Sequence, residues 1–134
     1  MFDSSRHAQQ VDAVFALAPV IPVITIAALE DAVPLARALA GNGLPVLEVT
    51  LRTDCALEAI ARIAAEVPEA CVGAGTVLSA ADLAAVERAG ARFAISPGVT
   101  EALYDAGAAS GIPLIPGIAT AGELMRGLER GWRR

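Results

Sequence analysis

The chain has 134 residues, of which 55% are hydrophobic, 19% charged and only 4% aromatic. This composition excludes a disordered chain and supplies a core for a single domain, which we expect to span residues 1–134. The net charge of −5 argues against a nucleic acid or an anionic membrane as partner. All ten basic residues are arginine, so the sequence contains no lysine.

The cellular compartment is predicted from the apolar runs and the cysteines. The longest apolar run, residues 14–29, is too short for a membrane span and is interrupted by Pro19 and Pro22. The first ten residues lack the pattern of a secretory signal peptide. Cys55 and Cys71 match no metal-binding or redox spacing. We therefore predict a cytoplasmic protein with reduced cysteines, no metal ion and no membrane contact.

Helical and strand-like patterns alternate along the chain. Residues 1–18 are predicted to contain one helix, around 7–17. Apolar runs typical of buried strands follow at 20–26, 45–51, 71–77, 92–98 and 112–118. Helical patterns follow these runs at 29–43, 54–68, 79–90, 100–111 and 120–131. Ser79, Thr100 and Thr120 are predicted helix N-caps, and each is soon followed by an acidic residue.

This strand–helix repeat over residues 19–134 predicts an α/β fold with a parallel sheet covered by helices. Two architectures compete, a doubly wound open sheet and part of a (β/α)8 barrel. Pro22, Pro113 and Pro116 argue against central strands that are hydrogen-bonded along their whole length. They suit barrel strands that bend or end near the rim.

The segment VLEVTLRT, residues 46–53, places charged side chains inside an apolar strand. Side chains alternate across a strand, so Glu48, Thr50 and Arg52 are predicted to share one face. The guanidinium of Arg52 can bind a carboxylate or a phosphate, and a partly buried Glu48 can act as a general acid and base. A salt bridge between Glu48 and Arg52 with a purely structural role is the alternative.

The segment GAGTV, residues 73–77, ends the third predicted strand. Its glycines allow close approach of the backbone, and Thr76 offers a hydroxyl at the rim. A dinucleotide-binding fingerprint requires a further glycine that is missing, so a tight strand-to-helix turn is favoured. The segments SPG (96–98) and PGIAT (116–120) end the next two strands with similar small, rigid residues. Together these strand ends predict a narrow pocket for a small anionic molecule.

Five segments in this order, VIPVI, LEVTLRT, VGAGTVL, FAISPG and PLIPGIAT, resemble the 2-keto-3-deoxy-6-phosphogluconate aldolase family, which includes 4-hydroxy-2-oxoglutarate aldolase. The resemblance implies a partial (β/α)8 TIM barrel with an N-terminal helix and about five βα units. It also implies a class I aldolase without cofactor, acting on a keto acid and usually assembled as a homotrimer. By motif, Glu48 would be the catalytic acid–base, Arg52 would bind the pyruvate carboxylate, and Thr76 would hold the same end of the substrate.

The family's Schiff-base lysine belongs to a segment that would lie just beyond Arg134. No residue in the chain substitutes for it, because a guanidinium stays protonated and is not nucleophilic. We therefore expect the N-terminal part of an aldolase, inactive by itself. A non-catalytic half-barrel for binding or assembly is the alternative, and a nucleotide-binding domain is a third. Outside the site, we expect His7 on the surface, and Tyr104 and Trp132 packed between helices or at a subunit contact.

Overall fold

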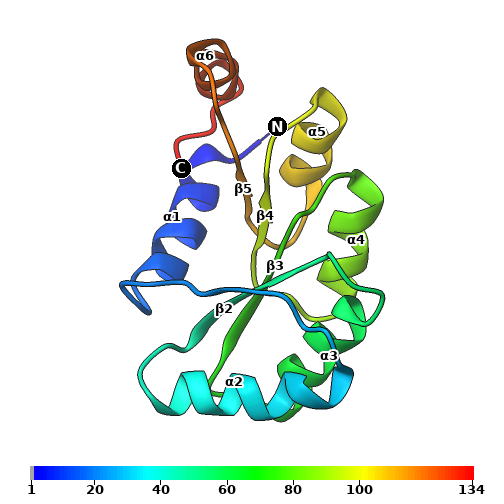
Figure 1. The fold of residues 1–134 in the computed structure, drawn as a ribbon. Helices are drawn as coiled ribbons and strands as arrows, with labels where there is room; N and C mark the ends of the chain where they lie inside the picture. Colours follow the sequence, from blue (N-terminus) through cyan, green and yellow to red (C-terminus); the bar gives the residue numbers. More distant parts are fainter. Residues whose placement is uncertain (1) are drawn as a thin grey trace.

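The computed structural model describes residues 2–134 and contains one parallel five-stranded sheet with flanking helices (Figure 1). The strands are β1 (Val23–Ile24), β2 (Val46–Thr50), β3 (Cys71–Gly75), β4 (Ala94–Ser96) and β5 (Leu114–Pro116). The helices are α1 (Ser4–Phe15), the 3-10 helix η1 (Leu29–Asp31), α2 (Ala32–Gly41), α3 (Ala56–Glu66), α4 (Ala80–Arg88), α5 (Glu101–Ala109) and α6 (Ala121–Glu129). Every predicted strand and helix is present.

The strands follow one another across the sheet in the order β1-β2-β3-β4-β5. In a doubly wound sheet the strand order reverses beside the first strand, which creates a switch point. An uninterrupted order of parallel strands is that of a (β/α)8 barrel. The structure therefore confirms the α/β fold and the partial barrel, and the doubly wound alternative is wrong.

The strands are shorter than the apolar runs that predicted them. β1 has only two residues, because Pro22 before it has no N–H to donate and contributes only its carbonyl, which accepts from the Glu48 N–H at 3.0 Å. At the other edge β5 ends at Pro116. The apolar pattern located each strand correctly and overestimated its paired length.

Side-chain caps define where several helices begin. Ser79, Thr100 and Thr120 each accept a hydrogen bond from a backbone N–H in the first turn of the helix that follows, as predicted. α1 begins earlier than predicted because the side chain of Asp3 caps it. Within residues 2–134, every helix is too short or too polar to span a lipid bilayer.

The two faces of the sheet pack against different helices. Leu47 and Val49 of β2 are fully buried in a large core cluster to which α2, α3, α4 and α5 contribute. The opposite face packs against α1, and Figure 1 shows α1 across the strands from α3, α4 and α5. The residues in this second cluster are Val14 and Ala18 from α1 and the turn after it, with Val46, Cys71 and Phe93 from the strands or beside them. α1 thus closes the inner face at the N-terminal ends of the strands.

His7 is buried, so its predicted position on the surface is wrong. Only 4% of its surface is exposed, and its Nε2 lies 2.8 Å from the Leu114 carbonyl oxygen. Phe2 and Trp132 enclose the imidazole, with ring centroids 5.4 and 4.4 Å from it. Trp132 also packs against Tyr104, and both are buried in the core, in agreement with the prediction that they pack between helices. The burial of His7 was not predictable from local sequence patterns, because Phe2 and Trp132 lie at opposite ends of the chain.

Candidate active site

Three predicted site residues belong to two neighbouring strands or to the residues that follow them, towards the C-terminal ends of the strands. Glu48 lies within β2, Arg52 follows β2 directly, and Thr76 follows β3. β2 and β3 pair in parallel, with Glu48 opposite Gly73 and Thr50 opposite Gly75. Because the carboxyl ends of parallel strands meet at one edge, this is the end where active sites of (β/α)8 barrels form.

Glu48 lies on the inner face of β2, directly over the glycines of β3. Its side chain is only 9% exposed, and its carboxylate occupies the space that a β-carbon on Gly75 would need. Burial raises the pKa of Glu48 above its usual value, and the positive charge of Arg52 partly offsets this effect. A carboxyl group with a raised pKa can both give and accept a proton near neutral pH.

Arg52 is exposed, and its guanidinium takes part in none of the ion pairs found among residues 2–134. The structure therefore does not contain the Glu48–Arg52 salt bridge considered as the alternative. The charge of Arg52 still acts on Glu48 through space, as the pKa of Glu48 shows. A planar guanidinium without a protein partner can bind a small carboxylate ligand, and here it lies beside the buried carboxyl group of Glu48.

Thr76 has a left-handed backbone, with φ at 60°. A β-branched residue is a genuine outlier there, and such strain costs about 1–3 kcal/mol. The other positive φ angles among residues 2–134 belong to glycines: Gly43, Gly90 and Gly131. Strained residues concentrate at ligand clamps and active sites, so this conformation points to a role for the half-buried Thr76.

One residue of the site region was missed by the sequence analysis. Thr53 follows Arg52, and its hydroxyl donates to the Ile26 carbonyl oxygen at 2.7 Å. Thr50 does the same on the other side of Arg52, donating to the Ile24 carbonyl oxygen at 2.9 Å. Two threonines at this spacing around an arginine are visible in the sequence, but only the structure shows what their hydroxyls contact.

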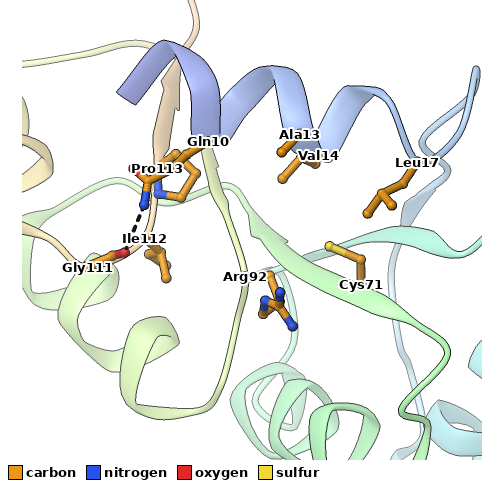
Figure 2. Close-up of a pocket in the computed structure, with 9 residues that line it drawn as sticks. All are labelled: Gln10, Ala13, Val14, Leu17, Cys71, Arg92, Gly111, Ile112 and Pro113. Atoms are coloured by element: carbon orange, nitrogen blue, oxygen red, sulfur yellow. Dashed lines mark hydrogen bonds between the residues drawn. The ribbon is translucent and has the colours of Figure 1, made fainter. Parts of the chain in front are cut away.

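A hollow lies away from these residues, between α1 and the N-terminal ends of β3, β4 and β5 (Figure 2). It has a volume of about 380 Å³. Its lining residues are Gln10, Ala13, Val14, Leu17, Cys71, Arg92, Gly111, Ile112 and Pro113. No group of three or more potential metal ligands occurs in the part of the chain that the structure describes.

Comparisons with known proteins identify the family. The family model for KDPG and KHG aldolase matches residues 11–134. The KHG/KDPG aldolase of Escherichia coli K12 is 58% identical over 120 residues, which make up 90% of this chain and 56% of the relative. The chain belongs to the KDPG and KHG aldolase family, and it spans little more than half the length of the curated relatives it matches.

Solved structures agree with this family. A KDPG aldolase from Legionella pneumophila, with pyruvate captured as a covalent carbinolamine, superposes with a TM-score of 0.87 at 55% identity. The match covers 90% of this chain and 58% of that one. The aldolase of Zymomonas mobilis ZM4 with 3-phosphoglycerate gives a TM-score of 0.87 at 51% identity, over 91% of this chain and 58% of that one.

Proposed function

We propose that this chain forms the part of a class I aldolase that binds the oxo acid and transfers protons. The reaction is the cleavage of 2-keto-3-deoxy-6-phosphogluconate to pyruvate and glyceraldehyde 3-phosphate, of 4-hydroxy-2-oxoglutarate to pyruvate and glyoxylate, or of both. The observation that carries the proposal is the buried carboxyl group of Glu48, held over Gly75 beside the unpaired guanidinium of Arg52. Relatives named KHG/KDPG aldolase support it.

Each site residue has a role in this proposal. Glu48 moves protons while the substrate's keto group is converted to an imine and while the carbon–carbon bond breaks. Arg52 binds the carboxylate at the pyruvate end through charge-assisted hydrogen bonds. Thr76 offers its hydroxyl to the same end, from a strained backbone position that fixes its direction. No metal ion or organic cofactor takes part.

The imine requires an amine that these 134 residues do not contain as a side chain, since all ten basic residues are arginine. In a class I aldolase the imine formed by a lysine acts as the electron sink for bond cleavage. We propose that this lysine is supplied from outside the 134 residues and that the chain alone does not cleave either substrate.

A chimera tests the proposal. Residues 11–134 replace the matched part of the Escherichia coli relative, so that the relative provides the rest of the barrel. We expect cleavage of at least one of the two substrates, and a loss of about 10²–10⁴-fold in kcat for Glu48→Gln. Arg52→Ala should weaken substrate binding about 10–100-fold, because a charge-assisted hydrogen bond is lost.

The matched control is Arg62→Ala, since Arg62 forms an exposed ion pair on α3 and touches none of the site residues. Its kinetics should equal those of the unsubstituted chimera. A chimera that folds and retains full activity after Glu48→Gln would overturn the assigned role of Glu48.

A non-catalytic binding or assembly module is the second candidate. Exposed apolar side chains at two places favour it: Val20 and Val23 at the edge formed by β1, and Leu124 and Met125 on α6, all between 47% and 61% exposed. Such patches are typical of surfaces that further protein covers. Sedimentation of the purified chain and the activity of the chimera test this candidate together: a stable oligomer of the chain, with a folded chimera that cleaves neither substrate, would favour it.

The family resemblance supports three finer parts of the proposal. The first is assembly as a homo-oligomer, which in the family is a trimer. The second is a cytoplasmic location, and the third is the assignment of residues 1–134 to one barrel domain. Sedimentation of the chimera tests the first of them.

A further inference from the structure

The loop that carries Arg52 is attached to β1 by side chains and not by the backbone. Backbone pairing between β1 and β2 ends at Ile24 and Val49. Beyond that point the Thr53 hydroxyl donates to the Ile26 carbonyl oxygen at 2.7 Å. The thiol of Cys55 donates to the same oxygen at 3.4 Å, a weaker contact.

Thr50 completes the attachment on the other side of Arg52. Its hydroxyl donates to the Ile24 carbonyl oxygen at 2.9 Å and lies 3.1 Å from the hydroxyl of Thr25. Arg52 is therefore bracketed by two hydroxyl–carbonyl hydrogen bonds, both directed at the short edge strand β1 or the residues that follow it. The Thr50 bond lies at the end of the backbone ladder, and the Thr53 bond continues the contact between the two segments beyond it.

The guanidinium of Arg52 has no hydrogen-bond or ion-pair partner in the described part of the chain, so no contact of its own fixes it. Its direction depends on the loop backbone from which it extends. A ligand that binds a mobile arginine must also order it, whereas a loop that is already fixed reduces that entropic cost. Leu51 anchors the start of the loop, donating from its N–H to the Gly75 carbonyl oxygen at 2.9 Å.

We propose that Thr53 is a positioning residue, which holds the Arg52 loop against β1 so that the guanidinium is in place for the carboxylate of a 2-oxo acid. This inference rests on the proposed function, because Arg52 is the group that touches the ligand. Thr53 suits this role because it is half-buried and its hydroxyl reaches the Ile26 carbonyl oxygen. Ile26 is only 2% exposed and is fixed in the core, so its carbonyl is a rigid acceptor.

The test is a pyruvate titration of the full 134-residue chain, followed by NMR, with Thr53→Val and Thr53→Ser. Valine keeps the shape of threonine and removes the hydroxyl, so the Kd for pyruvate should rise about three- to tenfold. Serine keeps the hydroxyl and should restore the affinity. The matched control is Thr100→Val, which removes the hydroxyl that caps α5, two strands away from Arg52 in the sheet order, and should leave the Kd unchanged.

A second readout is the Nε–Hε signal of Arg52 without ligand. In Thr53→Val this signal should shift and narrow as the side chain becomes more mobile, and in Thr53→Ser and Thr100→Val it should not. An unchanged signal and an unchanged Kd in a folded Thr53→Val chain would overturn the positioning role.

Arg52→Ala separates this inference from the proposed function. If Arg52→Ala abolishes pyruvate binding and Thr53→Val has no effect, the site stands and the role of Thr53 is wrong. If Arg52→Ala binds pyruvate as the unsubstituted chain does, or if the unsubstituted chain binds none, the proposed site is wrong. The Arg52 signal still decides in that case whether Thr53 holds the loop.

Discussion

The carboxylate of Glu48 lies against the α-carbon of Gly75 on the neighbouring strand, in the space where any other residue would place its β-carbon. A small side chain on β3 is therefore what allows a carboxyl group to occupy the inner face of β2. The same kind of packing occurs two residues earlier on β3, where the ring of Phe93 fills the space that a β-carbon on Gly73 would need. Two glycines on one strand thus make room for one large side chain from each neighbour.

Gly75→Ala should displace Glu48 and impair catalysis in the chimera with the Escherichia coli relative. The new methyl group meets the flexible end of the Glu48 side chain, so we expect the protein to fold and the carboxylate to move. A displacement of about 1 Å in a catalytic group can reduce the rate about 100-fold. Steady-state kinetics measures this, with circular dichroism as the check on folding.

Gly41→Ala is the control for that substitution, because Gly41 lies at the end of α2, a β-carbon there meets no atom within 4 Å, and its φ is not positive. Its kcat should remain that of the parent. Equal activity for both alanine variants would show that the position of Glu48 does not depend on Gly75.

The features of the site that depend on residues close together in the chain were predicted from the sequence. Alternation along β2 placed Glu48 opposite the face of Leu47 and Val49, and the structure confirms these two faces. Apolar runs and capping residues located every strand and helix, because both signals depend on residues close together in the chain.

Contacts between distant residues were not predictable in this way. His7 was predicted on the surface, yet it donates to a carbonyl on β5, more than a hundred residues away. The hydroxyl of Thr53 likewise finds its acceptor on the segment after β1. The pattern of polar and apolar residues records which side chains are buried within one element, and it does not record which elements meet.

Glu48→Gln should stabilise the protein more at neutral than at acidic pH. Burial raises the pKa of Glu48, so the folded protein holds its proton at a higher pH than the unfolded chain does. The stability that this group contributes is therefore present at low pH and is lost as pH rises through the folded-state pKa. Glutamine has the same shape and does not ionise. Urea unfolding of both proteins at pH 4 and pH 7 should show the advantage of glutamine growing with pH, and a constant difference would contradict a raised pKa.

Gly41 and Gly43, at the end of α2, should respond in opposite ways to alanine. Gly41 is helical with open space around it, so Gly41→Ala should raise the free energy of unfolding by about 0.5–1 kcal/mol. Gly43 has φ at +89°, and the residue after it, Leu44, donates back to the Leu39 carbonyl oxygen in a Schellman-type end. Gly43→Ala should lower the free energy of unfolding by about 1 kcal/mol, since a β-carbon is strained there. Denaturant unfolding measures both, and the same sign for the two variants would contradict the left-handed conformation of Gly43.

Acid should loosen the contact between α1 and β5 through His7. Burial lowers the pKa of His7, and the hydrogen bond to the Leu114 carbonyl opposes this effect only in part. Neutral histidine is thus favoured in the folded state, so its contribution to stability is full above its unfolded-state pKa and is lost as pH falls through the folded-state pKa. His7→Gln keeps an N–H donor for Leu114 and does not titrate. Between pH 8 and pH 5 the wild type should lose stability relative to this variant in urea unfolding, with hydrogen exchange rising first in α1. Parallel pH profiles for the two proteins would show that the imidazole is not held neutral by its burial.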